Sequence, residues 1–412
     1  MTRRELLELV AGLTLAAPSR VRCARDERLD DTIARAGDVI RGYSAEGFHR
    51  TATAVDRASA DRLIALARAA GAAASLEPFA LSRVDPIAQF LEIEGRRVDG
   101  LVMFDAPFTP AGGVTGAFGS AGSDRPIGSA RVPPNGEAAV ANLRARSPHR
   151  AIVVATMGGR PGLCPVNAAS FSKPFGPPVL QIGSEHADAL DRAANAGTEV
   201  RVVAHAARRD ATAYNVVSTI QGRSADLAPV CVMTPRSGWH ANASERGGGL
   251  VCWLEALRAI AAARPLRTAH FIASSGHELG HLGLHAYLDR NPSLAREAVA
   301  WVHFGANIGA STGEVRITCS GDGLSARARR ALAGYSLERI SEASASQVGG
   351  EAATIGEHGG RFISFIGSNA WFHNPGDLWP DAVDAAIVAR FARASADLAL
   401  ALANAPPASS RV

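Results

Sequence analysis

The strongest constraint on the fold is an alternation of apolar runs and helical patterns that begins after Tyr214. The runs are nearly continuous in apolar residues, as expected for strands that a sheet buries on both faces. They cover Val230–Met233, His270–Ala273, Ala298–Phe304 and Phe362–Ile366. Helical spacing appears at Leu250–Ala263, at Leu282–Arg290 and from Pro380 to about Ala403. Strands that alternate with helices predict an α/β fold in which helices cover both faces of the sheet.

Four loops follow these strands, and they hold an unusual share of the polar residues. In α/β sheets, ligands bind where loops leave the carboxyl ends of the strands. The loops span 234–249, 274–280, 305–310 and 367–377, and they contain His240, Glu245, Arg246, His277, Glu278, Asn307, His373 and Asp377. Because segments far apart in the sequence bring polar groups to one edge, we expect the functional site there.

The segment from about 86 to 209 has a different texture. Its short β-rich pieces are separated by stretches of Gly, Pro and Ser and by one helix, Ser184–Ala196. The pieces are Phe90–Ile93, Ala151–Val154, Val179–Ile182 and Val200–Val203. This pattern predicts a compact, mostly β domain at 86–209. It would be inserted into an α/β domain made of 25–85 and 210–405, with 406–412 as a disordered tail.

Composition argues against several classes of protein. The formal charge is +4, but Lys173 is the only lysine and the arginines are scattered, whereas nucleic-acid binders concentrate positive charge on one face. No apolar run reaches the roughly 18 residues that a membrane span needs. The five cysteines are far apart and form no Cys-x-x-Cys pair, so Cys231 and Cys252 are predicted to be small core residues.

The N-terminus supports two interpretations. Residues 1–24 contain Arg3-Arg4 followed by a short apolar stretch, as in a twin-arginine export signal. The alternative is an ordinary N-terminal helix, because Glu8 interrupts the apolar stretch. Both a cytoplasmic and an exported protein therefore stay open.

The segment His277–His281 matches His-Glu-x-x-His, in which two histidines on a helix hold zinc and the glutamate activates water. That chemistry needs an established helix. Here the segment follows a predicted strand after three residues, and Gly276, Gly280 and Gly283 weaken any helix. We therefore expect His281 and His285 to be packing or helix-surface residues.

Two other motifs indicate a binding or catalytic role and not a purely structural one. Glu245-Arg246 precedes three glycines at a helix start, where free N–H groups favour an anion; the alternative is a flexible entry with a solvent-facing ion pair. His373 lies in a turn-rich loop four residues before Asp377, as a metal ligand oriented by a carboxylate would. Ser237 as a nucleophile, with His277 or His373 as base, is a minor alternative because no Gly-x-Ser-x-Gly motif is present.

In this order, the segments resemble metallopeptidase family 28, which includes zinc aminopeptidases, glutaminyl cyclase and the transferrin receptor. The resemblance covers about residues 45–403. It rests on 51–57, 215–222, the Gly-Glu-Glu-like loop at 276–283 and Phe372–Asp377. It implies a zinc-exopeptidase-like mixed sheet covered by helices, and it identifies 86–209 with the protease-associated domain often inserted at this point.

The resemblance also implies where the family's two-zinc site would fall. The histidine after the first strand is replaced at Thr234, and Arg236 stands where the family has an acid. The bridging aspartate corresponds to Glu245, and the paired glutamates, base then ligand, correspond to His277 and Glu278. The aspartate after the third strand falls near Asn307, and the closing histidine is His373.

Three ligands of the family thus have counterparts, and the resemblance implies a single zinc on Glu245, Glu278 and His373. His277 would act as general base and Arg236 would bind a carboxylate or an oxyanion. Substrate contacts are expected from Thr234, Trp239, Arg246 and Asn307.

The first functional hypothesis is therefore a single-zinc hydrolase of an amide or peptide bond in a small substrate. The second is a metal-free homologue that uses the cleft to bind a ligand or a protein. Assembly into a homo-oligomer stays open.

Overall fold

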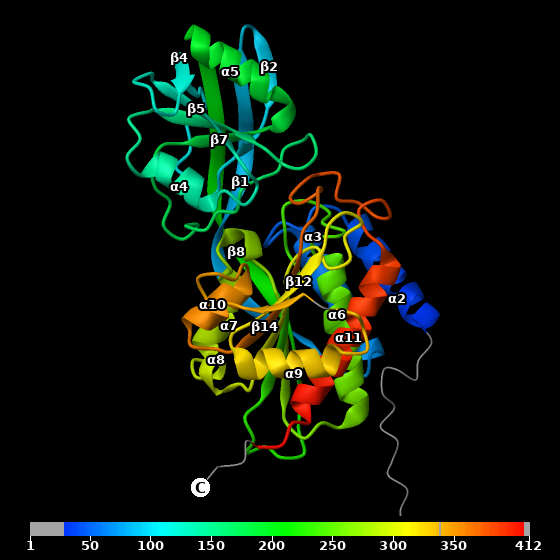
Figure 1. Ribbon diagram of the computed structural model, residues 1–412. Coiled ribbons are helices and arrows are strands. Elements are labelled where there is room, and N and C mark those ends of the chain that lie inside the picture. The colour runs from blue at the N-terminus through cyan, green and yellow to red at the C-terminus, as the bar shows by residue number, and fades with distance from the viewer. Residues whose placement is uncertain (1–28, 338, 408–412) are drawn as a thin grey trace, which may run out of the picture.

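The computed structural model describes residues 29–337 and 339–407. The export signal or helix predicted for 1–24 and residues 408–412 of the predicted tail lie outside the described residues. Within the described part of the chain, no helix is both long and apolar enough to cross a bilayer. Figure 1 shows two domains, a larger α/β domain below and a smaller one above it.

The α/β domain is built on a mixed sheet, as predicted. Its centre is parallel: β9 (Val230–Pro235) lies between β10 (Ala269–Ser274) and β11 (Trp301–Phe304), and β14 (Phe362–Gly367) follows β11. Antiparallel strands flank this centre, with β12 (Val315–Cys319) beside β14 and β8 (Glu199–Ile220) beside β10. The short β13 (Ile340–Glu342) closes one edge.

Helices cover both faces of this sheet, which explains the continuous apolar runs. Successive strand residues point to opposite faces, so Val232 and Phe271 pack on one side while Cys231 and Ile272 pack on the other. The first face is covered by α2 (Leu29–Ala45), α3 (Ala54–Ala69), α6 (Gly247–Ala263), α9 (Asp322–Leu332) and α11 (Ala385–Ala403). The second is covered by α7 (Leu282–Arg290), α8 (Leu294–Glu297) and α10 (Glu351–Glu357).

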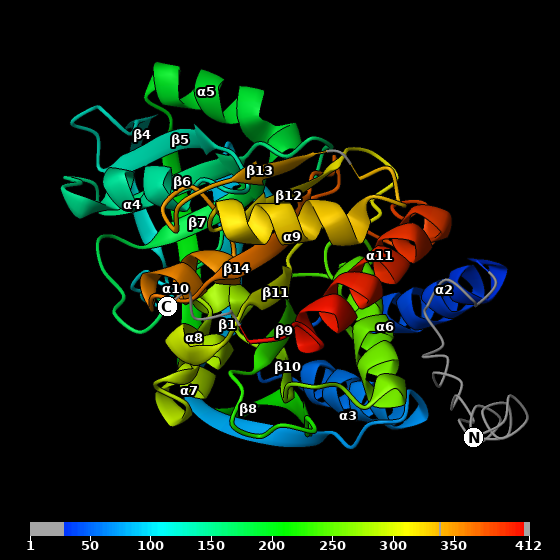
Figure 2. The same ribbon diagram turned by 60° about the horizontal axis from the view of Figure 1, so that its bottom comes forward.

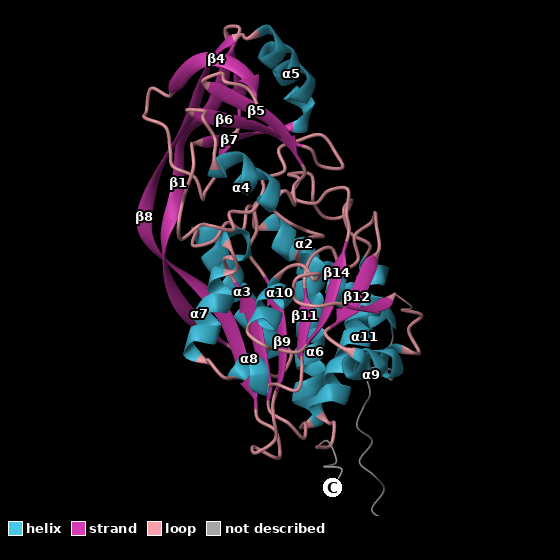
Figure 3. Cartoon of the chain, turned by 60° about the vertical axis from the view of Figure 1, so that its left-hand side comes forward, coloured by secondary structure: helices cyan, strands magenta, loops and turns pink. Residues whose placement is uncertain are grey.

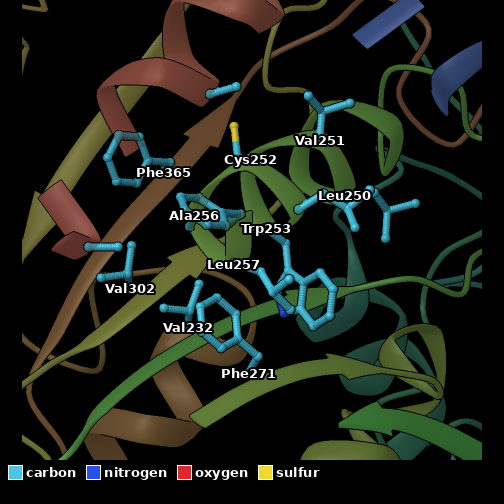
Figure 4. Close-up of a cluster of buried hydrophobic side chains, with 14 of the residues drawn as sticks. Val232, Leu250, Val251, Cys252, Trp253, Ala256, Leu257, Phe271, Val302 and Phe365 are labelled. Carbon is cyan, nitrogen blue, oxygen red and sulfur yellow. The ribbon is translucent and has the colours of Figure 1, made fainter. Parts of the chain in front are cut away.

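The core of the first face is dense around α6. Figure 4 shows the side chains of this helix above Val232, Phe271 and Val302 of the sheet. The Trp253 ring meets Phe271 edge to face, with centroids 5.6 Å apart, and both rings are fully buried. This packing fixes the direction of α6 and therefore the position of the loop that precedes it. Cys231 and Cys252 are free and buried, as predicted.

Two long antiparallel strands connect the domains. β1 (Ser75–Ile93) pairs with β8 along nearly its whole length, and Figure 3 shows the pair curving from the lower sheet into the upper domain. The predicted pieces Phe90–Ile93 and Val200–Val203 are the outer ends of these strands. Sequence patterns missed the middle, because Arg208, Arg209 and Asp210 interrupt the apolar alternation there.

The upper domain contains its own sheet and its own core. The sheet joins β4 (Val114–Ser120), β5 (Ile127–Val132), β6 (Ala151–Thr156), β7 (Val179–Gly183) and β3 (Leu101–Val102), and β2 (Arg96–Asp99) forms a hairpin with β1. Two helices, α4 (Glu137–Ala145) and α5 (Ala187–Ala196), lie against it (Figure 2). Its identification as a protease-associated domain stays a prediction.

Helix boundaries show where local chemistry overrides the apolar pattern. α7 has the predicted bounds, and α6 begins three residues earlier than expected. α11 begins at Ala385 and not at Pro380, because the Asp384 side chain accepts hydrogen bonds from the N–H groups of Ala386 and Ile387 and caps the helix there.

Candidate functional site

The four predicted loops lie at one edge of the sheet, at the carboxyl ends of β9, β10, β11 and β14. A cavity of about 860 Å³ lies between this edge and the upper domain. Its lining includes His277, His281 and Asn307 from the α/β domain, and Asn135, Glu137 and Asn167 from the upper domain. We call this cavity the cleft.

Glu245 and His373, two of the predicted zinc ligands, meet beneath the cleft. His373 Nε2 lies 3.3 Å from Glu245 Oε1, and both side chains are almost fully buried. The carbonyl of Pro165 accepts a hydrogen bond from His373 Nδ1 at 2.6 Å, which leaves Nε2 as the ring nitrogen that faces Glu245. Asp377 accepts the N–H groups of Ser244 and Glu245 and so fixes the loop that carries Glu245.

Arg246 provides the positive charge at this place. Its Nη2 lies 2.7 Å from the same Glu245 oxygen, and its Nε donates to the carbonyl of Ser237. Burial alone would raise the pKa of Glu245, but the charges of Arg246 and His373 outweigh it and lower the pKa to about 2. The sequence alternative of a solvent-facing Glu–Arg pair is wrong, because Arg246 is fully buried.

Glu278 is held by a separate set of groups. One carboxylate oxygen accepts the Thr51 N–H and hydroxyl, at 3.0 and 2.6 Å, and the other accepts the Ser237 hydroxyl at 2.7 Å. Both oxygens are therefore used within the protein. Ser237 is fully buried and its hydroxyl donates to Glu278. A substrate therefore cannot reach this hydroxyl, which argues against Ser237 as a nucleophile.

Arg236 is tied into the interior. Its Nη1 lies 2.8 Å from Asp56 Oδ1 and also donates to the Asp56 carbonyl, and Nη2 donates to the Tyr214 carbonyl. Both charged side chains are only 1% exposed. This arrangement gives Arg236 a structural partner and does not direct it into the cleft.

The predicted substrate contacts are spread over different environments. Thr234 is buried, and its hydroxyl donates to the Phe304 carbonyl. Trp239 packs edge to face on Phe104 of the upper domain and donates to Asn167. Of the predicted contact residues, Asn307 lines the cleft, and it adopts a left-handed backbone with φ 57°.

The residues present do not fit a zinc held by Glu245, Glu278 and His373. A catalytic zinc site uses three protein ligands and an open position. Glu245 Oε1 and His373 Nε2 face each other without an aligned hydrogen bond, so these two atoms could serve as metal ligands. The Glu278 oxygens, however, accept hydrogen bonds from Thr51 and Ser237. Arg246 already neutralises Glu245. Among the described residues, the one group of three or more such side chains with all ligand atoms within 4.8 Å of one another is His277, His281 and Glu351.

Sequence reasoning missed Glu351 and His303. Glu351 begins α10 after two glycines, and its carboxylate contacts His277 Nδ1 at 2.8 Å and His303 Nε2 at 3.3 Å. His303 lies within the buried strand β11. Neither residue lies in the four predicted loops, so no pattern pointed to them.

The chain has the fold of zinc aminopeptidases. No family model matches the sequence, and no curated protein matches it. The structure is similar to an aminopeptidase from Aneurinibacillus sp. strain AM-1, with 14% identity and a TM-score of 0.68 over 92% of this chain and 95% of that one. It is also similar to a zinc aminopeptidase from Bacillus subtilis, with 16% identity and a TM-score of 0.70 over 90% of this chain and 95% of that one. A peptidase M28 precursor from Shewanella amazonensis SB2B has 17% identity and a TM-score of 0.74 over 92% of this chain and 96% of that one. The predicted fold is thereby confirmed.

The buried pair of Arg236 and Asp56 yields a stability prediction. Asp56→Ala leaves a guanidinium buried without its partner, which costs about 3–5 kcal/mol of unfolding free energy. Asp61→Ala breaks the exposed pair with Arg57 and should cost less than about 1 kcal/mol. Chemical denaturation of both variants checks this. Equal losses of unfolding free energy in the two variants would contradict a stabilising role for the buried pair of Arg236 and Asp56.

A second prediction concerns pH. Burial lowers the pKa of His49 to about 3, against about 6.5 in the unfolded chain. This contribution to stability is complete above pH 6.5 and is lost as the pH falls towards 3. Asp377 acts in the opposite direction, because burial raises its pKa to about 7, so a variant is needed to isolate His49.

His49→Gln keeps an N–H that can donate to the Tyr43 carbonyl, which His49 Nε2 contacts at 3.0 Å, but it cannot titrate. When the pH falls from 6.5 to 5, the unfolding free energy of the wild type should decrease by about 2 kcal/mol more than that of the variant. Denaturation at the two pH values measures this. Parallel curves for the two proteins would contradict the assignment.

Proposed function

We propose that this chain binds a small polar molecule or short peptide with a free amino group in the cleft. We further propose that it does not hydrolyse the ligand through a zinc on Glu245, Glu278 and His373. The observation that carries this proposal is the Arg246 guanidinium against Glu245. A cation fixed in the chain already compensates the carboxylate that a metal would need.

The electrostatics support this choice over the hydrolase hypothesis. Glu245 stays ionised because Arg246 and His373 hold its pKa at about 2, against the effect of burial. A zinc ion on Glu245 would stand beside a buried guanidinium that has no deprotonated form. Removing either partner of such a buried pair is costly, so the arrangement resists replacement by a metal.

The lining of the cleft suggests the class of ligand. Among the described residues, the lining contains the carboxylates of Glu137 and Glu357 and no lysine or arginine, although the whole chain carries a formal charge of +4. Hydrogen-bonding side chains complete it, namely Asn135, Asn167, Asn307, Asn369, Ser368 and Thr354. Carboxylates and amides suit an ammonium group and peptide-like polar atoms. The structural neighbours named as aminopeptidases agree with a ligand that has a free amino end.

Calorimetric titration of the full chain with a set of dipeptides and their N-acetylated forms tests the proposal. Free dipeptides should bind more tightly than the acetylated forms, and Glu137→Gln together with Glu357→Gln should weaken binding about tenfold, or roughly 1.4 kcal/mol. Glu297→Gln, an exposed acid outside the cleft, is the matched control and should change nothing.

The same mixtures are then analysed by mass spectrometry for cleavage. We expect intact dipeptides. Turnover that disappears in Glu245→Gln would contradict the proposal, because it would place a working metal on the predicted triad.

A further inference from the structure

We propose that a single divalent metal ion of the zinc class binds to His277, His281 and Glu351, at the floor of the cleft. This site shares no ligand with the zinc site predicted on Glu245, Glu278 and His373. Its ligand atoms all lie within 4.8 Å of one another. Two imidazoles and one carboxylate form a donor set that zinc uses in proteins.

The three side chains come from segments that the fold holds close together. His277 belongs to a short 3-10 turn (His277–Leu279) after β10, His281 precedes α7, and Glu351 opens α10. His277 Nδ1 lies 2.8 Å from Glu351 Oε1, and the two histidine rings have centroids 5.1 Å apart. The donors therefore converge from three directions.

The motif His-Glu-x-x-His gathers the two histidines here without the helix that it normally requires. Gly280 and His281 both adopt left-handed backbone, with φ 77° and 59°, and end the turn. A non-glycine residue in this region is strained and persists only when its surroundings hold it. Glu278 turns away to Thr51 and Ser237, so the glutamate of the motif does not face this site.

His303 and Ser364 orient the carboxylate of Glu351 on the side away from His277. His303 Nε2 contacts its second oxygen at 3.3 Å, and the Ser364 hydroxyl lies 2.8 Å from His303 Nδ1. Such outer partners fix metal-binding carboxylates in known sites. Gly350 has φ 63°, and a Cβ there would lie 3.2 Å from the His303 ring, so the glycine leaves room for this contact.

The open side of this site faces the cleft. His277 and His281 are both partly exposed and line the cavity, so a donor atom of a bound ligand can complete the coordination. This last point rests on the proposed function, because it needs the ligand in the same cleft. Metal binding itself does not require that ligand.

Equilibrium dialysis of the full chain against Zn²⁺, with metal analysis, tests the site, and Co²⁺ substitution adds the absorption bands of a protein-bound ion. We expect one metal per chain. His281→Gln and Glu351→Gln should each weaken binding by about a hundredfold or more, since loss of an orienting group alone costs 10- to 100-fold.

His285→Gln is the matched control and should keep wild-type affinity, because it changes a neighbouring histidine of α7 that faces His358. Glu245→Gln removes the carboxylate beside Arg246 and is the variant that separates the two candidate metal positions; it should still bind one metal. Circular dichroism of each metal-free variant verifies folding, and His281→Gln alone decides if the buried Glu351 variant does not fold.

The outcomes separate the two proposals. No bound metal in the wild type, or full affinity in His281→Gln, overturns the site and leaves dipeptide binding untouched. Loss of the metal in Glu245→Gln but not in His281→Gln overturns both the site and the proposed function, because the ion would then lie beside Glu245.

Discussion

The ion pair between Arg246 and Glu245 organises the edge of the sheet. A buried carboxylate must be compensated, and here the compensating group is the next residue in the chain, 2.7 Å away. The same arginine holds the Ser237 carbonyl through Nε, and the Ser237 hydroxyl holds Glu278. One guanidinium therefore fixes the loop after β9 and, through Ser237, the direction of Glu278.

Much of the fold was predictable because burial on both faces leaves a clear pattern. Val232 and Cys231 face opposite helical layers, so their strand is nearly continuous in apolar residues, and the neighbouring strands are too, apart from single polar residues such as His270 and His303. The long β1–β8 pair was not predictable in full. Its middle carries the exposed residues Arg209 and Asp210, which break the apolar alternation although the two backbones stay paired. The start of α11 depended on the Asp384 cap, which competes with an apolar pattern extending to Pro380.

The candidate site was predictable only in its location. Loop order at a parallel edge brought Glu245 and His373 within 3.3 Å, which is where the sequence placed them. The direction of Glu278 could not be inferred, because it depends on left-handed residues at 280 and 281 and on hydroxyl donors from Thr51 and Ser237. Glu351 was missed because its approach to His277 is a tertiary contact between segments 74 residues apart. Side-chain partners of this kind leave no periodic signal.

The central claim is that the charge of Arg246 excludes a metal from Glu245. The most direct test is a crystal of the full chain soaked in zinc and measured on both sides of the zinc absorption edge. We predict one anomalous peak, within bonding distance of His277, His281 and Glu351, with the Arg246 guanidinium still against Glu245. A peak between Glu245 and His373, with Arg246 displaced, would contradict the account.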